Sequence, residues 1–237
     1  MTPAVIAGVL LILGYLAAES RLHRRGDGWP IHRSAAAAGT GFSTIAAGLV
    51  PGDGFPGEVT AHLLATMLAP LLFALAAPVT LVLRVADVHR WPRRTMLAVL
   101  HSRWVRGLTW WPVLLILDIG GLCLAYLSPL AHRPGWHLLL MAHMAATGWV
   151  FDTWLVGVDP VVDRPGVMGR AAVLIVVLAA HDVVAKVLFA QGGGVGAQLL
   201  FYGGDAVEVA TAIVLFWGWY ADAGRAQRHA RRRQLMS

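Results

Sequence analysis

Long apolar runs separated by short polar stretches dominate this sequence. A helix that crosses a membrane needs about 20 mostly apolar residues, and most of the runs approach that length. They do not alternate between apolar and polar positions, as the strands of a transmembrane β-barrel would. The pattern therefore predicts an all-α, polytopic membrane bundle. We place seven transmembrane helices in it, at about residues 2–18, 34–50, 58–83, 108–130, 136–156, 168–190 and 203–221.

Two of these spans have features of their own. No cluster of positive charge precedes the first span, so we expect a membrane anchor. Cleavage as a signal peptide, at the small residues that end this span, is the alternative. The second span is rich in Ala and Gly, which favours close packing inside the bundle over contact with lipid.

The composition agrees with a membrane protein. Hydrophobic residues make up 57% of the chain and charged residues only 14%, whereas charged residues are about a quarter of a soluble domain. The net charge is +6, but the basic residues lie in short connections, so we expect lipid rather than nucleic acid as the partner. The single cysteine, Cys123, excludes an intramolecular disulfide and a CxxC metal motif.

The arginines indicate how the bundle is oriented. They cluster in the connections after the first, third and fifth spans and after the seventh, whereas the other connections contain only Arg133. By the positive-inside rule the N-terminus lies outside and the C-terminus in the cytoplasm. Residues 222–237 then form a basic cytoplasmic tail. Residues 91–104 carry apolar side chains at helical spacing, which predicts an amphipathic helix on the inner leaflet, with a plain basic loop as the alternative.

Three of the predicted spans contain a histidine within the apolar run: His62, His143 and His181. Ionisable residues inside a membrane span mark candidate functional sites. Because a helix rises about 1.5 Å per residue, all three lie at similar depth in the outer half of the membrane. The same level also holds Glu58, His137, Asp205 and Glu208. Position alone leaves two alternatives open: a shared site for a metal or protons, or separate buried histidines that bond to carbonyls of neighbouring helices.

The fifth span adds softer side chains. His137, Met141 and Met144 recur at helical spacing and so share one face. Imidazole together with thioether suits Cu(I), whereas carboxylates alone suit harder ions. The alternative is that the methionines only fill space between helices.

Four further ionisable residues lie within the spans. Asp182 and Lys186 are one turn apart, which predicts an intrahelical ion pair, with Lys186 facing an acid of the seventh span as the alternative. Asp118 and Asp152 lie nearer the middle of the membrane, without a basic residue at their depth. They are either protonated and hydrogen-bonded between helices or part of a proton path.

Several short motifs follow one another along the middle of the chain. They are HLLATMLAPLL at 62–72, APVTL at 77–81, SRWVRGLT at 102–109, YLSPL at 126–130, His143, Gly148, GVDP at 157–160 and His181. Over roughly residues 55–190, the order and spacing of these motifs resemble those of the multi-spanning CtaG-type cytochrome c oxidase assembly factors.

The resemblance implies a role in building the copper-containing core of haem–copper oxidases, at the step that loads copper, in a bacterial plasma membrane. It also implies that His62, His143 and His181 correspond to family histidines that bind copper. The chain departs from the family pattern at two positions. Glu58 stands where a histidine usually precedes His62 by one turn, and Met141 stands where a second histidine often accompanies His143.

We predict a membrane protein that is not an enzyme and that helps a respiratory oxidase to mature by holding copper at an outward-facing site. The expected metal ligands are His62, His143, His181, Met141, Met144, His137 and Glu58. The acids expected to surround them are Asp182, Asp205 and Glu208. The expected partners are oxidase subunits, membrane lipid and an extracytoplasmic copper chaperone.

Two other classes of protein remain open. An intramembrane zinc hydrolase would hold zinc with three histidines and activate water with a carboxylate. A haem-binding or transport bundle would need two histidines that face each other across a gap wide enough for a macrocycle.

Overall fold

A computed structural model of the chain describes all residues except 1, 52–53, 87–90, 134, 161–163 and 237. The described residues form helices and no strand, which confirms the all-α prediction. In chain order the elements are α1 (Pro3–Arg24), α2 (Ile31–Leu49), α3 (Phe55–His62), the π-helix η1 (Leu63–Leu68), α4 (Ala69–Ala76), α5 (Pro78–Val85), α6 (Trp91–Leu100), α7 (Arg103–Leu108), α8 (Trp111–Tyr126), the 3₁₀-helix η2 (Pro129–His132), α9 (Trp136–Val156), α10 (Val167–Ala190) and α11 (Gly194–Met236).

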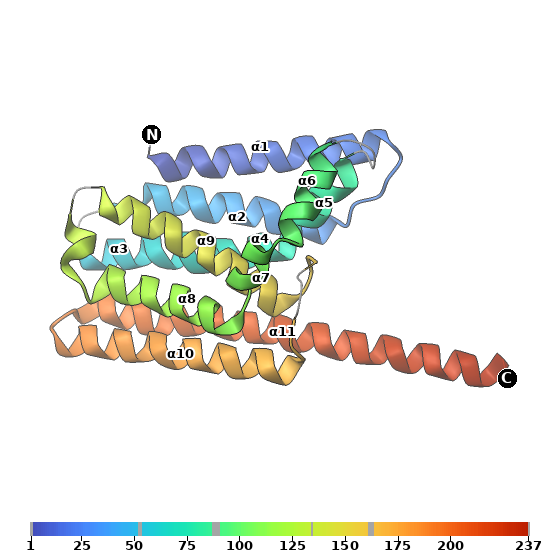
Figure 1. Ribbon diagram of the computed structural model, residues 1–237. Coiled ribbons are helices and arrows are strands. Elements are labelled where there is room, and N and C mark those ends of the chain that lie inside the picture. The colour runs from blue at the N-terminus through green and yellow to red at the C-terminus, as the bar shows by residue number, and fades with distance from the viewer. Residues whose placement is uncertain (1, 52–53, 87–90, 134, 161–163, 237) are drawn as a thin grey trace.

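Four helical segments are long and apolar enough to cross a membrane. They are α1, the run Phe55–Val85 from α3 to α5, α10, and the first part of α11, Gly194–Arg225. α8 is apolar but shorter, and polar side chains within α2 and α9 lower their mean hydropathy. Figure 1 shows α2, α8 and α9 lying alongside the longer segments. The structure therefore supports a helical membrane bundle, and the number of seven transmembrane helices stays a prediction.

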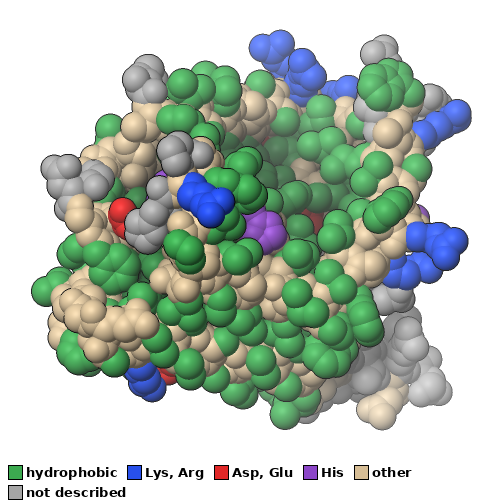
Figure 2. All heavy atoms as spheres, turned by 60° about the vertical axis from the view of Figure 1, so that its left-hand side comes forward, with side chains coloured by type: hydrophobic (Ala, Val, Ile, Leu, Met, Phe, Trp, Pro, Cys, Tyr) green, Lys and Arg blue, Asp and Glu red, His purple; other side chains and the backbone are tan. Residues whose placement is uncertain are grey.

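Large apolar side chains are exposed on the outside of this bundle. Examples from four helices are Leu10, Ile116, Ile175 and Ile213. Figure 2 shows that hydrophobic side chains cover much of the visible surface. A soluble monomer rarely exposes such extensive apolar surface, whereas contact with lipid requires it.

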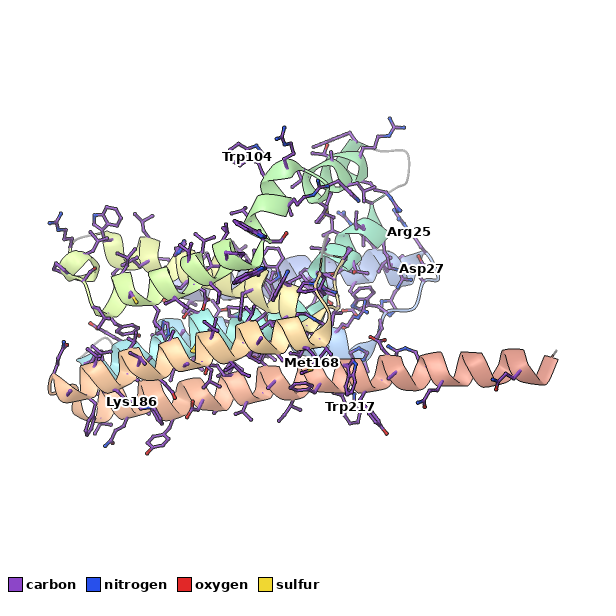
Figure 3. The ribbon with its side chains drawn as sticks, turned by 60° about the horizontal axis from the view of Figure 1, so that its bottom comes forward. Arg25, Asp27, Trp104, Met168, Lys186 and Trp217 are labelled. Carbon is purple, nitrogen blue, oxygen red and sulfur yellow. The ribbon has the colours of Figure 1, made fainter. Side chains whose placement is uncertain are left out.

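Arginines from three connections meet at one end of the bundle, which we call the arginine-rich end. Arg25 donates to the carbonyl of Val85 at 2.8 Å, and Arg93 donates to that of Leu83 at 3.0 Å, both at the end of α5. Arg164 follows α9 in the same region. Figure 3 shows Arg25 at this end and Lys186 toward the other end of the molecule.

The predicted span 58–83 is one apolar run in the sequence, but in the structure its helix is interrupted at two points. The π-helix η1 begins directly after His62. Pro70 has no N–H for the carbonyl of Thr66, so a regular α-helical pattern cannot continue across this point. A π-helical turn absorbs the mismatch, and such turns are frequent at functional sites.

The second interruption of this helix comes at Ala77, whose φ of 53° is left-handed. Pro78 then opens α5, whose first N–H groups lack partners within the helix. The carboxylate of Asp159 accepts hydrogen bonds from the N–H of Val79 at 3.1 Å, and from the N–H and hydroxyl of Thr80 at 2.8 and 2.6 Å. Two of the motifs noted in the sequence, at 77–81 and 157–160, are thus joined by a buried cap.

The predicted amphipathic helix at 91–104 is two short helices in the structure. α6 ends at Leu100, and α7 begins at Arg103, both at the arginine-rich end. The hydroxyl of Ser102 accepts the N–H of Val105 at 3.2 Å, and a side-chain cap of this kind starts a new helix.

α11 is one continuous helix from Gly194 to Met236. It begins within the glycine-rich stretch 191–196 that precedes the predicted seventh span, and it includes most of the predicted basic tail, 222–237. Figure 1 shows this last part extending beyond the bundle. The tail is thus helical, where the sequence suggested a separate segment.

Candidate functional site

A polar cavity of about 70 Å³ lies inside the bundle, and we call it the inner cavity. It is bounded by α3, η1, α8, α9, α10 and α11. Its polar lining consists of His62, Thr66, Asp118, Asp152, His181, Glu208 and Thr211. Above and below it pack two apolar clusters, one that includes Leu122 and Val184 and one that includes Phe151 and Leu174. The inner cavity thus holds a cluster of polar side chains between two apolar parts of the core.

His62 and His181 face each other across the inner cavity. Their ring centroids lie 6.4 Å apart, and the ring planes are inclined by 21°. Both side chains are buried. Nε2 of His62 and both ring nitrogens of His181 have no hydrogen-bond partner among the described residues. The two rings that sequence depth placed at one level are therefore together, with nitrogens available to a ligand.

The hydroxyl of Thr66 fixes the His62 ring. Its oxygen lies 2.9 Å from Nδ1 of His62 and 2.9 Å from the His62 carbonyl oxygen. A hydroxyl has one proton to donate, and here the carbonyl can only accept. Because the hydroxyl donates its hydrogen bond to the carbonyl, Nδ1 must carry the ring proton and donate a hydrogen bond to the hydroxyl oxygen. Nε2 is then left with a lone pair, which is the state that a metal ligand requires.

α11 contributes Glu208 and Gly204 to the surroundings of His181. Oε1 of Glu208 lies 3.8 Å from Nδ1 of His181, and neither carboxylate oxygen has a hydrogen-bond partner among the described residues. One turn earlier, a Cβ added to Gly204 would lie 1.9 Å from Cε1 of His181. The imidazole thus occupies the space that a side chain at this position would fill. Sequence reasoning missed Gly204, although its spacing of four residues from Glu208 placed both on one helix face.

α9 contributes Met144, which is buried and lines the inner cavity. Close approach of α9 to η1 depends on Gly148, because a Cβ there would lie 2.9 Å from the carbonyl oxygen of Thr66. Met67 of η1 also lines this cavity, so two imidazoles and two methionine side chains meet there, a set of side chains that suits a soft ion such as Cu(I). Among the described residues there is no group of three or more His, Cys, Asp or Glu side chains placed to hold a metal ion.

The structure places His143 outside the inner cavity. Its Nε2 lies 3.2 Å from the carbonyl oxygen of Leu117, so the ring ties α9 to α8. Successive residues of a helix point about 100° apart, and Met144 takes the direction toward the cavity. Of the three histidines that were predicted to converge, the structure brings His62 and His181 together at the inner cavity. Metal binding by His143 stays a prediction.

A second cavity of about 80 Å³, the outer cavity, lies near the N-terminal ends of α3 and α9. It collects Glu58, His137 and Met141, with Tyr126 in its wall. The ring of Tyr126 also meets the ring of His62 edge-on, with centroids 5.2 Å apart. The soft face predicted for α9 is thus divided, with two members in the outer cavity and Met144 in the inner one.

The remaining acids separate into two groups. Asp118 and Asp152 line the inner cavity, whose described lining contains no Lys or Arg. Asp182 lies 3.9 Å from Nζ of Lys186, as the predicted intrahelical pair requires. Asp182 and Asp205 are outside the described linings of both cavities.

Comparison with known proteins places these features in a wider context. A family model described as cytochrome c oxidase caa3 assembly factor (Caa3_CtaG) matches residues 13–193. Uncharacterized proteins of Mycobacterium bovis and Mycobacterium tuberculosis are each 30% identical over 210 residues, which cover 81% of this chain and 31% of the relative. An uncharacterized protein of Mycobacterium leprae is 25% identical over 209 residues, 80% of this chain and 31% of the relative. The chain thus spans about a third of the length of these relatives. No solved structure matches the chain.

Proposed function

The chain belongs to the cytochrome c oxidase caa3 assembly factor family, and from this premise we propose that it holds copper in the inner cavity and passes it to a maturing oxidase. Copper is the cargo in this proposal and not a resident cofactor, and the chain is not an enzyme. The expected partners are oxidase subunits and, as the source of the metal, an extracytoplasmic copper chaperone.

The unpartnered nitrogens of His62 and His181 are the observation that carries the proposal. A buried polar group without a hydrogen bond costs about 1–3 kcal/mol. Three such nitrogens in one small cavity are unfavourable until a ligand binds them. A metal ion satisfies several lone pairs at once, and the sulfur of Met144 favours a soft ion over a hard one.

In this proposal the cavities open to the outside of a bacterial plasma membrane. Seven helices cross the membrane, with the N-terminus outside and the C-terminus in the cytoplasm. The contacts of Arg25 and Arg93 at the end of α5 support this orientation, since cytoplasmic connections carry the excess of arginine. The cavities lie away from these contacts, toward the N-terminal ends of α3 and α9.

In this proposal the outer cavity captures the ion and the inner cavity holds it. Glu58, His137 and Met141 capture the ion in the outer cavity, where Glu58 and His137 are exposed. His62, His181 and Met144, whose side chains are buried, hold it in the inner cavity. Tyr126 lies against both, so the ion passes this ring on its way.

The test is the metal content of the full chain purified from a copper-supplied membrane. We expect about one copper per chain in the wild type and a loss of at least ten-fold in affinity in H62A/H181A, because metal-site changes commonly cost 10–100-fold or more. The control is H23A/H101A, which removes two exposed histidines that contact carbonyls of their own helices. Thermal unfolding of each variant shows whether it is folded.

Equal copper in the wild type and in folded H62A/H181A would contradict the proposal, as would a wild type without copper. Zinc in place of copper, together with hydrolysis of a lipid or amide, would favour the zinc hydrolase. A Soret band in the purified protein would favour a haem-binding bundle instead.

A further inference from the structure

A second site lies at the arginine-rich end, where a groove of about 580 Å³ opens between α7, α8, α9 and the connection before α10. We call it the basic groove. Its principal lining residues are Arg103, Arg106, Trp110, Trp111, Trp154 and Arg164. It shares no lining residue with either cavity described above. The basic groove therefore needs an explanation of its own.

The described lining of the basic groove is positively charged. Three arginines line it, and its described lining contains no Asp or Glu. Arg103 and Arg106 are exposed, whereas Arg164 is partly buried. Guanidinium groups gathered in a partly apolar groove attract an anion. The groove is thus complementary to a negatively charged group.

Arg164 is held in place by the backbone. Its guanidinium donates to the carbonyls of Thr153 at 3.0 Å and Asp159 at 3.2 Å, while its Nε is buried without a hydrogen-bond partner among the described residues. Burial lowers the pKa of this guanidinium, the neighbouring Arg170 cation lowers it further, and the Asp159 carboxylate raises it. A bound anion would add to the effect of Asp159.

The walls of the groove are aromatic, and two of their tryptophan rings are exposed. Trp110 and Trp111 are exposed at the start of α8, and Ile116 further along this helix is 70% exposed. Trp154 is only 1% exposed, and its Nε1 has no hydrogen-bond partner among the described residues. Tryptophans gather at the level of lipid headgroups, where an apolar ring and a polar N–H are both accommodated. On neighbouring α7, Figure 3 shows Trp104 pointing away from the bundle.

We propose that the basic groove binds an anionic phospholipid. The phosphate lies among Arg103, Arg106 and Arg164, and the acyl chains lie against the exposed rings of Trp110 and Trp111. Basic pockets between helices on the cytoplasmic side are suited to such headgroups. The exposed apolar rings beside the arginines favour a lipid over a free phosphate ion, because a phosphate ion has no apolar part to contact them. The proposal rests on membrane embedding and is independent of copper.

Lipid binding to the full chain in neutral detergent tests this proposal, by thermal shift and by native mass spectrometry. The probes are phosphatidylglycerol, phosphatidylcholine and inorganic phosphate. We expect phosphatidylglycerol to bind and stabilise the wild type, and the other two to have little effect. One arginine near a charged surface contributes about five-fold in affinity. R103Q should therefore bind phosphatidylglycerol about five-fold more weakly, and R103Q/R106Q more weakly still.

The matched control is R21Q/R24Q, which removes two exposed arginines of α1 that lie outside the groove. We expect less than a two-fold change in this variant. If R103Q/R106Q and R21Q/R24Q weaken phosphatidylglycerol binding equally, the proposal is overturned, because the lipid is then attracted to the arginine-rich end as a whole and not to the basic groove. Equal binding of phosphatidylcholine, or equal protection by inorganic phosphate, would also overturn it. If the double variant does not fold, R103Q alone decides, because Arg103 is exposed at the first position of α7.

Discussion

Asp159 and the pair His62–His181 are all polar side chains buried in the bundle, yet their surroundings differ. The two carboxylate oxygens of Asp159 accept three hydrogen bonds at the start of α5. The histidine pair leaves three ring nitrogens without a partner among the described residues. Burial alone therefore does not separate structural from functional polar groups in this molecule. The two examples differ in hydrogen-bond satisfaction: the satisfied carboxylate of Asp159 stabilises the fold, whereas the unsatisfied nitrogens of the histidine pair would be stabilised by a ligand.

The sharpest test of the structural half of this comparison is D159A. Removing the carboxylate leaves two N–H groups at the start of α5 buried and unpaired, so we expect the free energy of unfolding to fall by about 3 kcal/mol. Unfolding in detergent, followed by loss of helical circular dichroism, measures it. The copper content of the folded fraction should not change. A stable D159A, or a folded D159A without copper, would remove the distinction between the two clusters.

The functional half is tested by G204A. The added methyl group would overlap the imidazole of His181, which must then leave its present place beside His62. We expect copper affinity to fall about ten-fold, since small displacements of a ligand weaken a metal site strongly. The control is G218A in the same helix, where a Cβ would meet nothing within 4 Å. Competition with a Cu(I) chelator measures both, and equal affinities in the two variants would contradict the assigned site.

The sequence predicted the depth of these residues better than their direction. Arginine counting and helical rise brought His62 and His181 to one level, because both quantities depend only on position along the chain. The turn of a helix about its own axis depends on packing, so the sequence did not show that Met144 faces the cavity while His143 faces α8. The cap at Asp159 was hidden for the same reason, because it needs a partner distant in sequence.

His143 could be a structural polar group, like Asp159, or a metal ligand, like His62 and His181. The variant H143A distinguishes these two roles. As a tie to the carbonyl of Leu117 it contributes one hydrogen bond, so its loss should cost about 1 kcal/mol in unfolding free energy and leave copper content unchanged. As the third ligand implied by the family pattern, its loss should remove copper as H62A/H181A does. Measuring stability and metal content on one preparation separates the two outcomes.

The smallest expected effect concerns the outer cavity, whose polar groups are exposed and need no ligand to be satisfied. Glu58 should speed the approach of a cation without holding it, so E58Q should slow copper uptake about two- to three-fold and leave final occupancy unchanged. D205N is the control, since it removes an acid of α11 that lies outside the described linings of both cavities. Stopped-flow transfer from a Cu(I) chelator measures the rate. The difference should fade as salt is added, because salt screens exposed charges. A lower final occupancy in E58Q would instead make Glu58 a ligand and join the two cavities into one site.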